Sequence, residues 1–282
     1  FGALPFGATQ STICFGGEKN EGDISVVSFN VASAFGTVFE DTDSMERCAR
    51  FSNYMNECSP DLIGTQEMNS YWLDELGTTM PDYASYGVKR GGDSEEKNSE
   101  MNAVLWKKSS LEQNTIWLSE TPNEESKYTY IDDEGKPAEA GCNRICTYVV
   151  LIDNQTDEKL IFLNTHLDNA SQQAANFGIS VILDRIDALK TKYGEDVSII
   201  LTGDFNETDE GEAYKLAAEK LNDCTDKAQQ TATYQEWGYR QTGDKPIDFI
   251  FTTGEGYDYS VLNYLDNGYI SDHYGIYSNI KL

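Results

Sequence analysis

Short apolar runs that end at polar side chains constrain the fold of this 282-residue chain more than any other feature. Runs of this kind, rich in Val, Ile, Leu and Phe, predict β-strands. Predicted strands outnumber predicted helices, and both hairpins and crossover connections are needed to join them. The sequence therefore predicts an α/β (α+β) architecture in which two sheets pack together with helices outside them. The runs span residues 24–29, 62–65, 101–106, 144–152, 160–164, 197–201, 247–251 and 275–280.

Three stretches follow the helical period instead. Residues 171–193 carry one apolar stripe, and residues 213–221 predict a short helix. A further helix is expected to start at Asp43 or Ser44, both good N-caps, and to end before Pro60. Its expected buried face consists of Met45, Cys48, Phe51 and Met55.

The remaining segments define the predicted organisation. Residues 1–23 are rich in glycine and polar residues and predict an irregular leader or capping segment. Residues 24–282 show neither an internal repeat nor a linker, which favours one domain. Residues 120–140 are polar and contain two prolines, which predicts a long surface loop.

The charge of the chain limits its partners. The formal net charge is −27 and the sequence pI is about 4.2, so the field of the protein repels nucleic acids and anionic membranes. No apolar run approaches the ~20 residues of a transmembrane helix, so no stable membrane insertion is expected. The acidity fits a soluble protein and weakly favours a secreted or extracellular one. No protein partner is inferred. The cations that could meet a phosphate are scattered: Lys89, Arg90, Arg144, Arg240 and Lys245.

Cysteine and histidine usage narrows the chemistry. Six cysteines permit disulfides without requiring them, and the absence of a CxxC pair argues against zinc. Only two histidines occur, His166 and His273, and each lies beside Asp or Asn at the end of an apolar run. Histidine titrates near neutral pH and can donate, accept or carry charge. A structural role is the alternative for either one, but two such placements favour chemistry.

Polar groups lie at five predicted strand ends, and a sixth, Asp248, lies early in an apolar strand. Buried charges are costly unless they are paired or bound to metal. Carboxylate and amide oxygens without thiolates suit a hard cation, so Mg²⁺ or Mn²⁺ is the expected metal. Such an ion polarises a phosphoryl oxygen. The five ends carry Asn30, Glu67, His166, Asp204 with Asn206, and Asp272 with His273.

In their order along the chain, these motifs resemble the endonuclease/exonuclease/phosphatase superfamily, whose fold is DNase I-like. The resemblance runs from residue 28 to residue 273 and implies a four-layer sandwich of two mixed sheets flanked by helices. It also implies metal-dependent phosphoester hydrolysis. The motifs are Ser28-Phe29-Asn30, Thr65-Gln66-Glu67, residues 164–168, residues 203–206, residues 247–250 and Ser271-Asp272-His273.

The resemblance assigns the metal and phosphate contacts by position. Glu67 matches the principal metal ligand, which Asn30 and Asp272 complete or support. Asn30 is also expected near the substrate phosphate. Arg144 resembles an arginine of bacterial secreted members and suits bidentate phosphate binding. A surface ion pair is its alternative role.

The catalytic groups follow in the same way. Asp204 and Asn206 match the pair that orients the attacking water and the phosphate. His273 matches a histidine paired with an aspartate, here Asp248. His166 matches the histidine that donates to a phosphate oxygen or assists the leaving group.

Two departures from the family pattern are visible. Gln235 stands where many bacterial relatives have a histidine, so any substrate contact made there has changed. Tyr274-Gly275 follows His273, where an aromatic residue and proline are common, which is a local loop difference.

The resulting hypothesis is a divalent-metal-dependent phosphodiesterase or nuclease that acts on a compact phosphoester or a nucleic-acid end. A processive nuclease would need a basic groove, and a sphingomyelinase an exposed apolar hairpin. Neither is visible in the sequence. The alternatives are a phosphomonoesterase of sugar or inositol phosphates, and a non-catalytic binding domain on the same fold.

Overall fold

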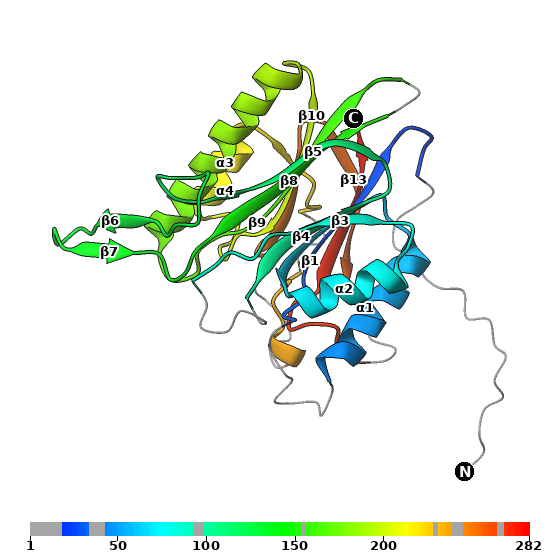
Figure 1. Ribbon diagram of the computed structural model, residues 1–282, viewed down its shortest axis with the longest axis horizontal. Coiled ribbons are helices and arrows are strands. Elements are labelled where there is room, and N and C mark those ends of the chain that lie inside the picture. The colour runs from blue at the N-terminus through cyan, green and yellow to red at the C-terminus, as the bar shows by residue number, and fades with distance from the viewer. Residues whose placement is uncertain are drawn as a thin grey trace, which may run out of the picture.

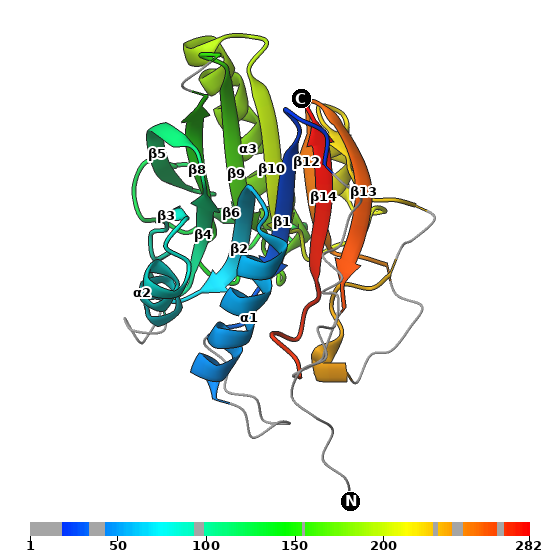
Figure 2. The ribbon, with the colours of Figure 1, turned by 90° about the vertical axis from the view of Figure 1, so that its right-hand side faces the viewer.

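Two six-stranded sheets pack face to face in the computed structural model, which confirms the predicted sandwich (Figures 1 and 2). The structure describes residues 19–33, 43–92, 99–153, 156–227, 231–238, 245–263 and 268–282. The first sheet has the order β13 (Glu255–Leu262), β14 (Gly275–Lys281), β1 (Ile24–Asn30), β2 (Leu62–Met68), β4 (Met101–Trp106) and β3 (Ala84–Tyr86).

The second sheet packs against the first, and both sheets are mixed. β1 and β2 are parallel, as are β9 and β10, whereas the other paired strands within the two sheets are antiparallel. Its order is β11 (Asn222–Asp223), β12 (Asp248–Thr252), β10 (Ser198–Asp204), β9 (Lys159–His166), β8 (Ile145–Ile152) and β5 (Ser109–Trp117).

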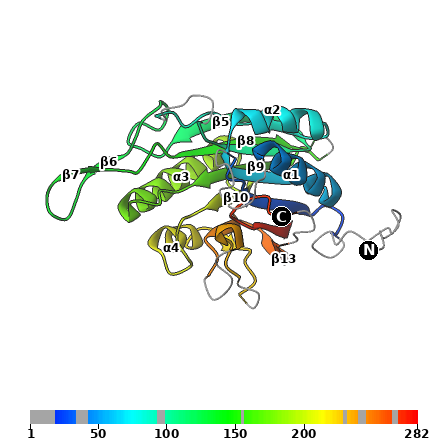
Figure 3. The same ribbon diagram turned by 90° about the horizontal axis from the view of Figure 1, so that it is seen from below.

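Helices cover both outer faces and complete four layers (Figure 3). α1 (Ser44–Cys58) and α2 (Ser70–Thr79) pack on the first sheet through residues such as Phe51 and Trp72. α3 (Gln172–Tyr193) and α4 (Glu212–Ala218) pack on the second sheet. A third apolar cluster fills the space between the sheets, with Phe162 and Ile250 among its members.

The two longest helices begin where the sequence indicates. The side chain of Asp43 accepts from the backbone N–H of Met45, and that of Ser171 accepts from Ala174, which satisfies free N–H groups at each start. Cys48 is fully buried, as expected for a core thiol. Met45 is 38% exposed, so its inclusion in the buried face of α1 is wrong.

A polar network links the two sheets behind their shared end. Gln66 Nε2 donates to Ser28 Oγ at 3.1 Å and to Asn164 Oδ1 at 2.7 Å. The amide nitrogen of Asn164 donates to the carbonyl of Thr65 at 2.7 Å, across from β9 to β2. The sheets approach so closely here that a Cβ on Gly64 would lie 2.1 Å from the hydroxyl oxygen of Thr202.

Other expectations are corrected or extended. Residues 120–140 are not one long loop, because they include the hairpin of β6 (Thr129–Ile131) and β7 (Pro137–Glu139). Among the helices and longer strands, α2, β5 and β13 were not predicted, and neither were the short strands β3 and β11. Residues 19–23 carry neither helix nor strand, and residues 1–18 of the predicted leader lie outside the described part of the chain. The five cysteines among the described residues are free thiols. No described helix is long and apolar enough to cross a membrane.

Candidate active site

The strand pairing brings three predicted site residues into one row. His166 ends β9, Asp204 ends β10 and Asp248 begins β12, and the register pairs His166 with Asp204 and Asp204 with Asp248. Parallel β9 and β10 end at the same edge, and antiparallel β12 starts there. The row therefore lies at one end of the second sheet, and all three residues are at least 94% buried.

The first sheet contributes Glu67 and Asn30 at the same end. The pairing of β2 with β4 shifts between Thr65 and Met68, and Glu67, within this irregularity, has a left-handed φ of 54°. Irregularities of this kind re-aim side chains next to active sites, and a non-glycine residue held at positive φ is strained. The local distortion therefore turns the Glu67 carboxylate toward the other polar groups.

Asn30 joins the two sheets at the site. Its amide nitrogen donates to Glu67 Oε1 and to Asp204 Oδ2, both at 3.0 Å, and its amide oxygen accepts from the backbone N–H of Ala32 at 3.1 Å. In this arrangement Asn30 fixes the positions of two carboxylates. Its predicted contacts to metal and phosphate remain predictions.

His273 reaches the row from the segment before β14. Its Nδ1 lies 2.9 Å from Asp248 Oδ2, and its Nε2 lies 3.7 Å from Asp204 Oδ2. Burial alone would lower the pKa of His273, but the carboxylates, Asp248 foremost, raise it to about 10. The ring is therefore an imidazolium at neutral pH, held in one orientation by Asp248.

His166 has the opposite character. Its Nε2 lies 3.5 Å from Asp204 Oδ2. Burial, together with the positive charges of Arg144, Arg90 and His273, holds its pKa well below the usual 6.5. One histidine of the site is thus neutral and the other charged.

Asp204 lies between the two histidines. Burial and the neighbouring Asp248 raise its pKa to about 6. Asn30 and the backbone N–H of Asn206 donate to its two oxygens, at 3.0 and 2.9 Å. A carboxylate with a pKa this close to neutrality can accept a proton from water at physiological pH.

Glu100 is a site residue that the sequence analysis missed. Glu67, Glu100 and His166 each offer a ligand atom, and these atoms lie within 4.8 Å of one another. Burial and then Glu100 raise the pKa of Glu67 to about 7. Arg90 lies 2.7 Å from Glu100 and forms an ion pair with it. The only signal in the sequence is an acidic residue just before an apolar strand, which is common on surfaces.

Arg144 is buried beside this group. Its Nε lies 3.4 Å from Asp168 Oδ2, and its NH2 group donates to Asn169 Oδ1 at 3.0 Å. The alternative prediction for Arg144 was an ion pair at the surface. Its location at the surface is wrong, since Arg144 is only 7% exposed. The ion pair itself exists, and phosphate binding remains a prediction.

Asn206 and Asp272 lie at the edge of the site. Asn206 adopts a left-handed φ of 54°, and its amide nitrogen donates to the carbonyl of Leu167 at 3.0 Å. Asp272 belongs to neither acidic cluster. Its negative charge still raises the pKa of Glu67, as a nearby carboxylate does.

Arg47 of α1 connects two loops of the site through hydrogen bonds. Its guanidinium is fully buried and donates to the carbonyls of Val31, Ala32 and Ile270 at 3.0, 2.8 and 2.6 Å. These carbonyls belong to the segments that carry Asn30 and Asp272. The guanidinium also lies over the ring of Trp237, 5.1 Å from its centre.

The sequence profile of the Endonuclease/Exonuclease/phosphatase family matches residues 27–273, from β1 to the second histidine. The chain belongs to this family. Endonucleases, exonucleases and phosphatases all break phosphoester bonds, so the chain belongs among hydrolases of that bond. No curated protein sequence gives a significant match.

Solved structures with the same fold cover almost the whole chain. The endonuclease/exonuclease/phosphatase of Bacteroides vulgatus is 24% identical with a TM-score of 0.80, over 92% of this chain and 99% of that one. The mannosyl-6-phosphatase Bt3783 of Bacteroides thetaiotaomicron is 23% identical, with a TM-score of 0.76 over 92% and 100%. D. rerio TDP2 complexed with single-strand DNA product is 18% identical, with a TM-score of 0.65 over 93% and 100%.

The family departure at Gln235 has a structural explanation. The Gln235 side chain is buried, donates to the carbonyl of Ser271 at 2.7 Å and accepts from the N–H of Gly238 at 2.6 Å. Its backbone N–H also donates to the carbonyl of Asp272 at 2.8 Å. Gln235 therefore fastens the segment before His273 and has little capacity left for a substrate.

The oxygen-rich cluster fits a hard cation. Two half-buried carboxylates, Glu67 and Glu100, converge here, and that crowding makes the charged form of Glu67 unfavourable without a further positive charge. The amide nitrogen of Asn30 donates a hydrogen bond to one carboxylate oxygen of Glu67, at 3.0 Å. The carboxylate oxygens of Glu67 and Glu100 are the ligands that suit Mg²⁺ or Mn²⁺.

Proposed function

We propose that this chain is a Mg²⁺- or Mn²⁺-dependent hydrolase of compact phosphoesters. One observation carries the proposal: two clusters, Glu67–Glu100–His166 and Asp204–Asp248–His273, share one end of the sandwich. Asn30 links them, because its amide donates to a carboxylate of each. A phosphate held there would meet oxygen ligands for a cation, a charged histidine and a carboxylate base.

The charge of each side chain at neutral pH determines the catalytic role that we propose for it. Asp204 accepts a proton from the attacking water, since its pKa of about 6 leaves it largely ionised at neutral pH. The His273 imidazolium, oriented by Asp248, stabilises negative charge on the phosphoryl oxygens. Neutral His166 donates a hydrogen bond to a phosphoryl or leaving-group oxygen. Glu67 and Glu100 would hold the cation, which when bound polarises a phosphoryl oxygen.

Three of the predicted phosphate-binding cations already form ion pairs with carboxylates, which favours a compact substrate. Arg90 pairs with Glu100, Arg144 with Asp168, and Lys245 with Asp209 and Glu210 at 2.6 and 2.8 Å. Of the other two predicted cations, Lys89 forms no ion pair with a described residue, and Arg240 lies outside the described residues. Cations that are already neutralised add little to the binding of a long polyanion, which depends on released counterions.

Within compact phosphoesters we favour a phosphate on a sugar over a nucleic-acid end. The charge of −27 opposes even a short polyanionic strand, whereas a sugar phosphate brings one anionic group to the cation site. The mannosyl-6-phosphatase of Bacteroides thetaiotaomicron shares this fold, which supports a sugar phosphomonoester as the first candidate and a small diester as the second.

A substrate panel tests the proposal. The purified protein is assayed with Mg²⁺ or Mn²⁺ on p-nitrophenyl phosphate, bis-p-nitrophenyl phosphate, mannose 6-phosphate and a short DNA strand. We expect hydrolysis of a small ester or sugar phosphate that exceeds the rate on DNA. DNA as the best substrate would contradict the compact-substrate proposal. No hydrolysis of any phosphoester would favour the binding-domain alternative.

A further inference from the structure

The β6–β7 hairpin and the start of α3 line a hollow outside the two catalytic clusters. The hairpin stands apart from both large sheets and projects past the start of α3 (Figures 1 and 3). Between hairpin and helix lies an open hollow of about 660 Å³. That volume falls within the range of small-molecule sites. The hairpin takes no part in the two catalytic clusters.

The hairpin is fixed to the helix by aromatic packing. Tyr128 stacks on Phe177 of α3 with ring centres 4.0 Å apart and on Tyr130 at 5.5 Å, with interplanar angles of 9° and 16°. The hydroxyl of Tyr130 lies 2.7 Å from Ser171 Oγ at the start of α3. The aromatic wall of the hollow is therefore held in place before any ligand arrives, which reduces the entropy lost on binding.

The hollow is also tied to the catalytic centre. The N–H of Gly141, just after the hairpin, donates to Asp168 Oδ2 at 2.9 Å, and Asp168 pairs with Arg144. Ser171 follows His166 by five positions, so their Cα atoms lie at most about 18 Å apart even along an extended chain. A short oligosaccharide can span that separation.

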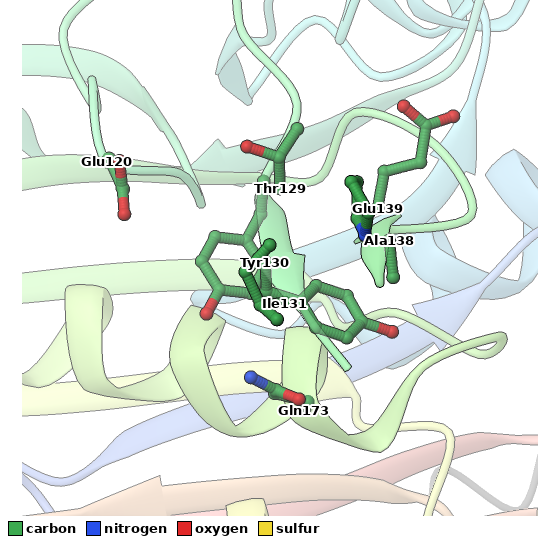
Figure 4. Close-up of a pocket in the computed structure, with 9 residues that line it drawn as sticks. Glu120, Thr129, Tyr130, Ile131, Ala138, Glu139 and Gln173 are labelled. Atoms are coloured by element: carbon green, nitrogen blue, oxygen red, sulfur yellow. The ribbon is translucent and has the colours of Figure 1, made fainter. Parts of the chain in front are cut away.

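The lining combines ring faces with hydrogen-bonding groups and no cation. Figure 4 shows Tyr130 and Ile131 of the hairpin above Gln173 of α3, with Glu120 to one side and Glu139 to the other. The nearby Lys127 is paired with Glu139 at 3.0 Å. The Glu120 carboxylate and the absence of a cation from the lining disfavour a nucleic-acid phosphate in this hollow.

A neutral sugar satisfies each of these features. The C–H face of a pyranose packs on an aromatic ring, and its hydroxyls donate to carboxylates and bind amides. We propose that the hollow between β6–β7 and α3 is a carbohydrate subsite, which holds a neutral sugar of an oligosaccharide whose phosphate occupies the catalytic centre. The phosphate part of this inference rests on the proposed function, whereas the sugar part does not.

Binding of neutral sugars tests the subsite without catalysis. The full chain is titrated with mannotriose, cellotriose, N-acetylchitotriose and thymidine dinucleotide and followed by saturation-transfer NMR. We expect at least one trisaccharide to bind, and the Tyr130→Ala and Gln173→Ala variants to lose that binding. Glu134→Ala, at the exposed turn of the hairpin, is the matched control and should bind normally. Circular dichroism verifies that each variant is folded. Gln173 is an exposed side chain, so its variant remains informative if Tyr130→Ala unfolds the hairpin.

Kinetics then links the subsite to the reaction. Mannose 6-phosphate and mannotriose 6-phosphate are the two substrates. Tyr130→Ala should lower kcat/KM on the longer one about 10-fold, the size of one aromatic contact. Gln173→Ala should lower it about 5-fold, the size of one hydrogen bond, and both variants should leave the shorter one unchanged. Binding of no trisaccharide, preference for the dinucleotide, or binding that survives both variants would overturn the subsite. Sugar binding without any phosphoester hydrolysis would instead overturn the proposed function and keep the subsite.

Discussion

His273 Nδ1 lies 2.9 Å from Asp248 Oδ2 in a setting from which water is almost excluded, with the two residues 6% and 0% exposed. The pair crosses from one sheet to the other, since Asp248 starts β12 and His273 precedes β14. An ion pair buried this deeply is retained only where its geometry is good. Here it fixes the charge and the orientation of one of the two histidines of the chain.

The first prediction concerns the titration of the two histidines. In protein treated with EDTA, His273 should lose its proton near pH 10, whereas His166 should stay neutral to well below pH 6.5. Asp248→Asn removes the main carboxylate and should bring the pKa of His273 down sharply. Two-dimensional ¹H–¹⁵N spectra of the imidazole rings measure both values. A His273 that titrates near 6.5 in the wild type would rule out the charged pair.

The same pair makes a prediction about stability. Because the folded pKa of His273 lies above its unfolded value of 6.5, its stabilising contribution is complete below pH 6.5 and is lost as the pH rises through about 10. The difference in unfolding free energy between wild type and Asp248→Asn should therefore shrink across that window. Urea denaturation at a series of pH values gives the difference, and a gap that widens toward pH 10 would have the wrong sign.

Metal binding should depend on the first cluster. Glu67→Gln and Glu100→Gln each remove one charged oxygen ligand from the cluster and should weaken Mn²⁺ affinity at least about 10-fold, as loss of a metal-site partner typically does. Isothermal calorimetry measures the affinity, and Glu139→Gln on the distant hairpin is the control. Unchanged Mn²⁺ affinity in Glu67→Gln would remove Glu67 from the site.

Arg47 should matter for the integrity of the loops. Arg47→Met leaves the carbonyls of Val31, Ala32 and Ile270 without their buried donor. We expect a loss of about 3 kcal/mol in unfolding free energy, since each unsatisfied group costs roughly 1–3 kcal/mol. Urea denaturation is the measurement, with Glu46→Gln on the exposed face of α1 as control. A loss of unfolding free energy no larger than that of the control would show that the loops do not depend on Arg47 for their stability.

Salt dependence reports how many phosphates the protein contacts. On a 20-nucleotide strand, log affinity should fall with log salt by no more than the equivalent of about one to three cation–phosphate contacts, since each adds ~0.9 to the slope on duplex DNA. Arg90, Arg144 and Lys245 are already paired with carboxylates. A steep slope, together with a strong preference for the strand over a small diester, would reveal a nucleic-acid groove.

Much of the fold could be predicted because the strands are short apolar runs with polar ends. Residues 101–106 form a strand with the predicted bounds, and Ser171 caps α3 as its sequence suggests. α2 was missed because it buries only Trp72 and Leu76, too few residues to show a helical period. The β6–β7 hairpin was missed because its residues are exposed or half-buried, so no apolar alternation marks it.

The site was predictable where residues follow strands and unpredictable where the packing of the sheets decides. Glu67 and Asp204 could be found because each closes an apolar run. Glu100 could not, because its proximity to Glu67 depends on the pairing of β2 with β4, and its proximity to His166 on how the two sheets meet. Arg47 looks like a surface charge on an amphipathic helix until the loops that it binds are in place.

The central claim is that both clusters act in one metal-dependent hydrolysis. The most direct measurement is the rate of p-nitrophenyl phosphate and bis-p-nitrophenyl phosphate hydrolysis by wild type, Glu67→Gln and Asp204→Asn, with Mn²⁺ and with EDTA. We predict that the wild type hydrolyses at least one ester only with metal, and that each variant, still folded, loses at least about 100-fold in kcat/KM, the scale of one catalytic group. Hydrolysis that persists in EDTA, or a folded Asp204→Asn with the wild-type rate, would contradict the account.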